Sequence, residues 1–282
     1  MLRRVESCDQ TYFMKLKILY EDKDILAIDK PSGVMVHEDG RSKEETITDW
    51  VIKKYPKLKG IGEPVTFSGE EIDRPGIVHR LDKETSGVLL IMKTKEAFAY
   101  FKKQFMDRKI EKTYYAIVSG FVKKDHEIIN KPIGRSPKDF RRRLAGRGAR
   151  GEMREAITEY KVLKRFEAKC IHFSGLSQAD GPRVSAPRAR GDSDPKNECT
   201  LPLSYLEIHP KTGRTHQIRV HMKYINHPVV CDSLYDPKGV CPKGLDRLAL
   251  HAKSIEFKGL NGKKIKIESL IPKEFAKIVK GQ

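Results

Sequence analysis

The sequence predicts an α+β fold with a central mixed, mostly antiparallel sheet. Apolar segments of strand length dominate the 282 residues, and only a few segments have the pattern of a helix. The two kinds of segment do not alternate regularly along the chain, as they would in a doubly wound parallel sheet. Antiparallel neighbours therefore fit the order of the segments best.

The first elements follow from local patterns. Two apolar segments, KILY (17–20) and ILAIDKP (25–31), flank a short charged turn and predict a hairpin. A short helix is predicted at 46–55, because the residue before Pro56 disfavours helical backbone. A second helix is predicted at 95–109, where an alanine and three phenylalanines share one face and are predicted core residues: Ala97, Phe98, Phe101 and Phe105.

The later elements follow from the same patterns. Residues 57–74 are rich in glycine and proline and predict a loop. Beyond the second helix, strands and two short helices are predicted where apolar segments recur. The strands are predicted at 112–122, 156–166, 204–210, 248–257 and 263–269, and the helices at 215–225 and 273–279.

One domain is predicted over residues 15–282, after a flexible tail at 1–14. Two segments interrupt its order of strands and helices. Residues 135–154 hold a cluster of arginines with glycines and no helical apolar face, and no strand or helix is predicted there. Residues 167–202 are rich in Gly, Pro, Ser, Asp and Arg, and they predict a mobile insertion because such a segment can bury little apolar surface.

Charge and composition limit the partners and the compartment. Lys and Arg number 56 against 38 Asp and Glu, so the net charge of +18 favours a polyanion such as nucleic acid over a merely solvated basic surface. No apolar run approaches the ~20 residues that a membrane helix needs, and the N-terminus lacks the apolar core of a signal peptide. A soluble, cytoplasmic protein is expected, and it is expected to be a monomer because no sustained heptad is present.

The cysteines support the same compartment. Their number is odd and no C-x-x-C pair occurs, which favours reduced thiols over a disulfide framework or a zinc ribbon. The five are Cys8, Cys170, Cys199, Cys231 and Cys241.

Asp82 is the main candidate for chemistry. It lies in a polar break, HRLDKETSG (79–87), between two apolar segments, and is either a turn residue or the carboxylate of a site. A buried carboxylate stays ionised only beside a cation. Arg80 would point to the same face in an extended segment, and Arg219 lies in the semi-apolar GRTHQIRVHM (213–222). A structural ion pair or a surface position is the alternative for Arg219.

Other reaction classes fit less well. No phosphate-binding loop and no metalloprotease motif occurs, so neither a nucleotide nor a metal is predicted. Ser86 and Ser204 lack the nucleophile elbow of a serine hydrolase. Four histidines lie close in sequence but without the spacing that would stack two of them on one helix face: His209, His216, His221 and His227.

These segments together resemble the RluA-type pseudouridine synthases. HRLDKETSG resembles the signature of that family, and ILYEDKDILAIDKPSGVMVH, KTYYAIVSG and GRTHQIRVHM resemble its other blocks in the same order, from about Lys15 to Phe275. The resemblance implies the pseudouridine synthase fold, with helices and loops flanking the sheet around an active-site cleft. It also implies isomerisation of specific uridines in structured rRNA or tRNA, with no cofactor and no metal. The S4 module of many relatives is not expected, and the insertion at 167–202 departs from the family pattern.

The resemblance also implies roles for individual residues. Asp82 is the expected catalytic residue and Arg219 its ion-pairing partner, while Arg80 helps to expel the target base and fill its place. Tyr114 is expected to stack on the uracil and to assist removal of the C5 proton, with strand packing as the alternative. Asp82 would attack the sugar or the base covalently, or remove a sugar proton.

RNA contacts are expected outside these catalytic residues. A stacked uridine has to be turned outward to reach a pocket, and the arginines of 135–154 are the candidate clamp on the phosphates. The alternative is that 135–154 is a disordered basic loop that contacts nothing. The insertion either extends this clamp or is a tolerated surface loop, which is favoured. A non-catalytic RNA-binding protein on a retired enzyme fold is the rival function. The expected RNA-binding residues are Arg80, Thr85, Arg135 and Arg214.

Overall fold

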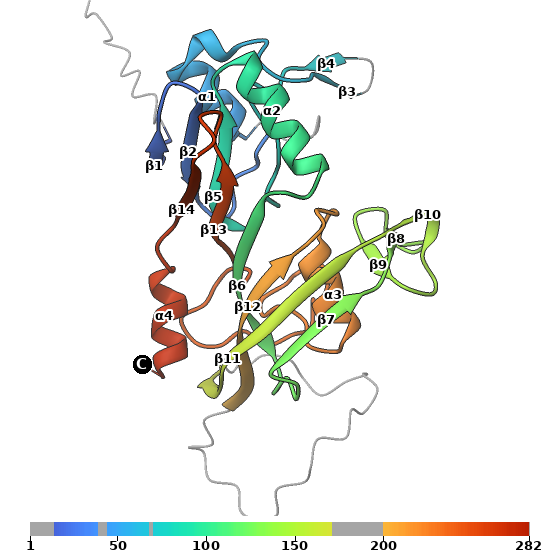
Figure 1. Ribbon diagram of the computed structural model, residues 1–282. Coiled ribbons are helices and arrows are strands. Elements are labelled where there is room, and N and C mark those ends of the chain that lie inside the picture. The colour runs from blue at the N-terminus through green and yellow to red at the C-terminus, as the bar shows by residue number, and fades with distance from the viewer. Residues whose placement is uncertain (1–13, 39–43, 68–69, 171–199, 282) are drawn as a thin grey trace, which may run out of the picture. The chain divides into compact units, whose positions relative to one another are not determined.

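The structure is a computed structural model, and it describes residues 14–38, 44–67, 70–170 and 200–281 (Figure 1). These residues form two compact units. Unit 1 contains the described residues up to Lys112 together with Ala252–Leu270, and unit 2 contains Thr113–His251 together with the described residues from Ile271 on. The predicted tail lies outside the described residues except for Met14, and the single domain at 15–282 stays a prediction.

The sheet of unit 1 contains the predicted hairpin. Strands β1 (Lys17–Glu21) and β2 (Ile25–Lys30) are antiparallel, and β2 pairs antiparallel with β5 (Ser86–Met92). Next to β5 lies β13 (Leu250–Lys258), which pairs antiparallel with β14 (Lys264–Glu268). Every residue of β5 is buried, which agrees with its apolar run Val88–Met92 and includes Ser86 at its start. A Cβ on Gly87 would overlap the backbone of Ala252, so a glycine is needed at this contact.

Both predicted helices of unit 1 are present. Helix α1 (Ile47–Lys54) begins with a capping box between Thr46 and Asp49 and ends before Pro56. Helix α2 (Lys95–Met106) begins at the N-cap Thr94. Its predicted apolar face is confirmed, because Ala97 and Phe101 are fully buried and the two other phenylalanines, Phe98 and Phe105, pack against the same core.

The loop predicted at 57–74 is wrong in part. It contains a 3-10 turn, η1 (Pro56–Leu58), and a small hairpin of β3 (Val65–Phe67) and β4 (Glu70–Ile72). Strands of three residues are too short to show an alternating pattern in the sequence. The glycines and prolines of this segment indicated a loop, so these two short strands were not predicted.

The main sheet of unit 2 is antiparallel throughout. It has the order β6 (Glu111–Ser119), β12 (Thr200–Pro210), β11 (Ile157–Lys169) and β7 (His126–Asn130). The predicted strands and the helices α3 (Gln217–Tyr224) and α4 (Lys273–Lys280) are confirmed, whereas β7 was not predicted. The α+β class is therefore confirmed.

The arginine-rich segment contains strands that were not predicted. It forms a three-stranded antiparallel sheet in the order β10 (Arg150–Arg154), β8 (Ile133–Arg135) and β9 (Arg143–Ala145), here called the basic sheet. Gly146 and Gly148 supply positive φ angles of 70° and 89° in the turn after β9, which side-chain-bearing residues rarely adopt. Glycines that suggested a loop in fact make tight turns between short strands.

Three further predictions concern the insertion, the cysteines and membrane-spanning helices. The ladder of β11 and β12 continues to the pair Lys169 and Thr200, so strands enter both ends of the predicted insertion, whose residues 171–199 lie outside the described ranges. Cys231 and Cys241 form a disulfide, so reduced thiols were wrongly predicted for this pair. No helix within the described ranges is long and apolar enough to cross a membrane.

Candidate active site

Asp82 lies in a turn of unit 1 that is anchored on both sides. Its carbonyl oxygen accepts a hydrogen bond from the Thr85 amide at 3.1 Å. Leu81 before the turn and Thr85 after it are 4% and 2% exposed, whereas Asp82 itself is only partly buried. The buried neighbours fix the backbone while the carboxylate-bearing residue reaches the surface. Thr85 is thus part of the support of the turn, and its RNA-binding role stays a prediction.

The end of β2 holds this turn in shape. The ammonium group of Lys30 is buried and donates to the carbonyl oxygen of Lys83 at 2.9 Å, and the Gly33 amide donates to the same oxygen at 2.9 Å. The Ser32 hydroxyl donates to the Glu84 carbonyl oxygen at 2.6 Å. Buried polar groups need such partners. The residues that follow Asp82 are therefore positioned by a segment from another part of the chain.

His79 supports the turn from the other side. Its Nε2 accepts a hydrogen bond from the Leu90 amide at 2.9 Å, and its ring stacks on Phe105 with centroids 4.9 Å apart. Burial, and then the charge of Lys112, lower the pKa of His79 to about 3. A neutral ring that accepts at Nε2 carries its proton on Nδ1.

Arg80 and Tyr114 lie in different units, and their expected roles stay predictions. Arg80 is exposed, and its guanidinium contacts Nε2 of His37 at 3.3 Å. Tyr114 lies on β6 opposite Ile208 of β12, and its neighbour Tyr115 packs edge-on against Tyr205 with centroids 5.3 Å apart. Adjacent strand residues point to opposite faces, so Tyr114 faces away from this aromatic pair.

Arg219 forms a buried ion pair with Asp232, a partner that sequence reasoning did not name. Its Nε donates to Oδ2 of Asp232 at 2.7 Å and its second terminal nitrogen donates to Oδ1 at 2.8 Å, with side chains 6% and 0% exposed. Asp232 Oδ1 also accepts from the amides of Leu234 and Tyr235 at 3.0 and 2.9 Å. A guanidinium has five N–H donors, so two bonds to Asp232 leave room for another acceptor.

The ion pair predicted between Arg219 and Asp82 joins residues of different units and stays a prediction. The structural ion pair, which was the alternative reading of Arg219, is present with Asp232. The signal in the sequence was weak, because Asp232 lies in CDSLYD (231–236) without apolar periodicity around it. The two readings are compatible, since one carboxylate behind a guanidinium can orient it toward a second.

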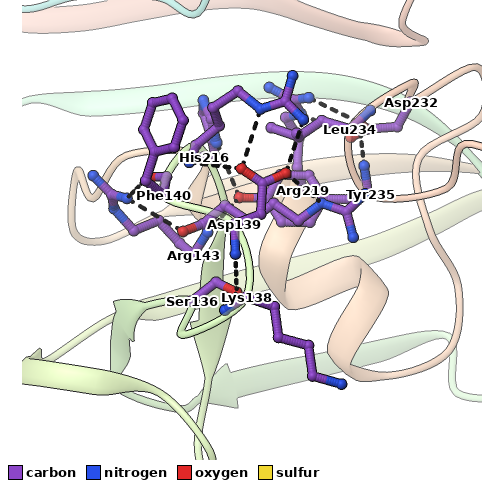
Figure 2. A network of polar contacts seen from close by, with 12 residues as sticks. Ser136, Lys138, Asp139, Phe140, Arg143, His216, Arg219, Asp232, Leu234 and Tyr235 are labelled. Atoms are coloured by element: carbon purple, nitrogen blue, oxygen red, sulfur yellow. Dashed lines mark hydrogen bonds and ion pairs between the residues drawn. The ribbon is translucent and has the colours of Figure 1, made fainter.

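Figure 2 shows how this pair connects to the basic sheet. The Tyr235 hydroxyl accepts a hydrogen bond from the Arg143 amide at 2.9 Å and lies 2.9 Å from Nδ1 of His216. The Tyr235 ring lies 5.1 Å from the Arg219 guanidinium carbon. One tyrosine thus touches the ion pair, the start of α3 and strand β9.

The predicted RNA-binding arginines of unit 2 differ in their surroundings. Arg135 is exposed at the end of β8, where it pairs in register with Arg143 on one side and Arg150 on the other. Arg214 is partly buried, and its Nε donates to the Glu155 carbonyl oxygen at 2.9 Å. Arg135 therefore belongs to a concentrated positive surface, whereas Arg214 also braces a loop.

The described residues offer little to a metal ion. Among them, no group of three or more His, Cys, Asp or Glu side chains has an arrangement that could hold one. His221 is instead used internally, with its ring nitrogens 2.8 Å from the Thr158 hydroxyl and 2.9 Å from the Lys131 carbonyl oxygen. The expected absence of a metal stays a prediction.

Comparison with known proteins identifies the family. Residues 24–224 match the family model of RNA pseudouridylate synthases. The chain belongs to the RNA pseudouridine synthase family. This membership confirms the RluA-type resemblance and the predicted enzyme class, since the family consists of isomerases that act on RNA.

Individual relatives agree with this membership. An uncharacterized RNA pseudouridine synthase of Aquifex aeolicus is 39% identical over 220 residues, which are 78% of this chain and 56% of that protein. The ribosomal large subunit pseudouridine synthase D of Xanthomonas campestris is 30% identical over 276 residues, which are 94% of this chain and 68% of that protein. The chain thus spans little more than half the length of the first of these family members.

Solved structures confirm the pseudouridine synthase fold. Human RNA pseudouridylate synthase domain containing 1 aligns with a TM-score of 0.62 at 22% identity, covering 92% of this chain and 84% of that one. Human RNA pseudouridylate synthase domain containing 4 aligns with a TM-score of 0.61 at 23% identity, covering 92% and 90%. At these identities the likeness concerns the fold alone.

Proposed function

We propose that this chain is a cytoplasmic RNA pseudouridine synthase that isomerises specific uridines in structured ribosomal or transfer RNA. The observation that carries the proposal is the family match over residues 24–224, a range that includes Asp82, Tyr114 and Arg219. The net charge of +18 supports an RNA substrate. The ribosomal names of relatives such as that of Xanthomonas campestris support ribosomal RNA in particular.

Asp82 is the proposed catalytic residue. Isomerisation breaks the N1–C1′ bond, turns the uracil and forms a C5–C1′ bond, while the base loses the C5 proton and gains one at N1. An ionised carboxylate can attack C1′ or the base, or remove a proton from the sugar. The anchored turn described above supports this role, because it fixes the backbone of Asp82 without burying the residue.

Arg219 and Tyr114 are the proposed partners of Asp82. A guanidinium beside a carboxylate favours the ionised form and fixes its orientation. Asp232 would support this role by holding Arg219 in one rotamer through two hydrogen bonds. Tyr114 would stack on the uracil and assist removal of the C5 proton.

RNA binding is assigned to exposed arginines. We expect Arg80, which is exposed beside the Asp82 turn, to enter the space that the extruded uridine leaves. The basic sheet with Arg135 would contact phosphates and supply affinity with little sequence choice. Arg214 would contribute a contact next to the site, whereas Thr85, only 2% exposed, would act through the turn that it supports.

The substitution Asp82→Asn tests the proposal because it removes the charge and keeps the shape. We expect no pseudouridine in unmodified ribosomal or transfer RNA transcripts, with RNA affinity and thermal stability close to wild type. Asp246→Asn, an exposed carboxylate elsewhere in the chain, is the matched control and should keep full turnover. Substantial turnover by Asp82→Asn would overturn the role of Asp82. No new pseudouridine from the wild-type protein with either RNA would favour the non-catalytic RNA-binding rival.

A further inference from the structure

Tyr235 occupies a central position in unit 2. It is 6% exposed, and its side chain contacts both α3 with its N-cap and strand β9. Its ring lies 5.1 Å from the Arg219 guanidinium carbon and edge-on to His216, with ring centroids 5.6 Å apart. Its backbone amide donates to Asp232 at 2.9 Å. Burial and several partners restrict the orientations that the Tyr235 side chain can adopt.

The hydroxyl of Tyr235 reaches the basic sheet. It accepts a hydrogen bond from the Arg143 amide at 2.9 Å and lies 2.9 Å from Nδ1 of His216. A tyrosine hydroxyl can accept one bond and donate another, so both capacities are used when it donates to an unprotonated Nδ1. Arg143 belongs to β9 and pairs directly with Arg135 of β8. The hydroxyl therefore binds the strand next to the exposed arginines.

Tyr235 also belongs to a small apolar core next to the basic sheet. Ile133 of β8 and Val220 of α3 are 4% and 3% exposed and pack with Tyr235 in one cluster, against which Ala145 of β9 also packs. Val220 follows Arg219 directly in α3. The basic sheet is thus packed against the helix that carries the arginine, and interiors of this kind transmit displacements instead of absorbing them.

We propose that Tyr235 is a positioning residue that couples the basic sheet to Arg219. RNA phosphates that bind the arginines of the sheet fix β9, β9 fixes the Tyr235 hydroxyl, and the tyrosine with Asp232 fixes the guanidinium. Binding of RNA away from the reacting base would in this way order the arginine that serves the catalytic carboxylate. The expected effect on turnover rests on the proposed function. The coupling of the basic sheet to Arg219 rests on the described contacts alone.

A double-mutant cycle measures the coupling. Tyr235→Phe removes the hydroxyl and keeps the ring beside Arg219, and Arg135→Ala removes an exposed charge of the basic sheet. In the wild-type background we expect Arg135→Ala to raise KM and to lower kcat, and we expect Tyr235→Phe alone to lower kcat about 10-fold, as the loss of a buried hydrogen bond allows. In the Tyr235→Phe background, Arg135→Ala should raise KM only. Interacting residues show such non-additivity.

The matched control is Tyr224→Phe, the same chemical change on an exposed tyrosine at the end of α3. It should leave kcat and KM at wild-type values. Effects of Tyr235→Phe and Arg135→Ala that multiply in both kcat and KM would overturn the coupling. So would a wild-type kcat for Tyr235→Phe.

Hydrogen exchange tests the coupling without turnover. The amides of Leu234 and Tyr235 are bonded to Asp232 and report on the ion pair. An unmodified ribosomal RNA transcript should slow their exchange in the wild-type protein and leave it unchanged in Tyr235→Phe. Equal protection in both proteins would overturn the proposal. Protection in a wild-type protein that forms no pseudouridine would refute the proposed function and leave the coupling standing.

Discussion

The guanidinium of Arg219 donates two hydrogen bonds to the carboxylate of Asp232, of 2.7 and 2.8 Å, in a buried position. Bidentate geometry is specific to arginine, because a lysine offers a point charge without the planar fork. The backbone amides of Leu234 and Tyr235 also donate hydrogen bonds to Oδ1 of Asp232. Asp232 is therefore held in place by several bonds, and with Tyr235 it orients Arg219.

Loss of the Asp232 carboxylate should destabilise the folded protein. We expect Asp232→Asn to lower the free energy of unfolding by roughly 3 kcal/mol, because it leaves the Arg219 charge buried beside a neutral amide. Denaturant titration of the purified protein measures this change. Asp236→Asn is the control, since the Asp236 carboxylate pairs with the exposed Lys223 at 3.3 Å and its loss should change stability by less than about 1 kcal/mol. Equal effects of the two variants would contradict the buried pair.

His79 should make stability depend on pH. Its pKa of about 3 in the folded protein lies below the unfolded value of 6.5, so its neutral form contributes stability fully above pH 6.5. That contribution is lost as the pH falls from 6.5 toward 3, because the unfolded chain takes up the proton first. Between pH 7 and pH 5 the wild-type protein should lose about 2 kcal/mol more than His79→Gln.

Denaturant titrations of both proteins at the two pH values check this difference. Other titrating groups are common to both proteins and cancel in the comparison. Parallel pH profiles would show that His79 titrates normally in the folded state.

Arg135 should bind RNA through its positive charge, by contact with a phosphate. We expect Arg135→Ala to weaken binding of unrelated RNA sequences by similar factors, because phosphate contacts carry no sequence information. The slope of log affinity against log salt should fall by about one, the contribution of one phosphate contact. Filter binding of several transcripts at different salt concentrations measures both quantities. Lys23→Ala, at an exposed position of unit 1, should change neither.

Much of the fold was predictable where apolar residues recur at helical spacing, or where a residue such as Pro56 marks the end of an element. Helix α2 followed from four apolar residues on one face, and the end of α1 followed from Pro56. The basic sheet and the β3–β4 hairpin were missed because their strands have three to five residues. Such strands are fixed by their neighbours in space and leave little periodicity in the sequence.

The candidate site was predictable only in part, for a related reason. Asp82, Tyr114 and Arg219 lie in recognisable motifs, whereas Asp232 and Tyr235 lie in a segment without pattern. Their importance comes from contacts with Arg219 and Arg143, which are distant in sequence or on other elements. Lys30 was overlooked likewise, because a lysine at the end of a strand usually reaches solvent and this one does not.

The buried ammonium group of Lys30 has a practical consequence for work on isolated fragments. It binds the backbone at Lys83, 53 positions later in the chain. A synthetic peptide that carried only HRLDKETSG would lack both this bond and the one from Ser32, and we expect it to be unstructured in water. Grafts of the motif into another scaffold would need the preceding DKPSG turn as well, so the smallest transplantable piece comprises two stretches of chain.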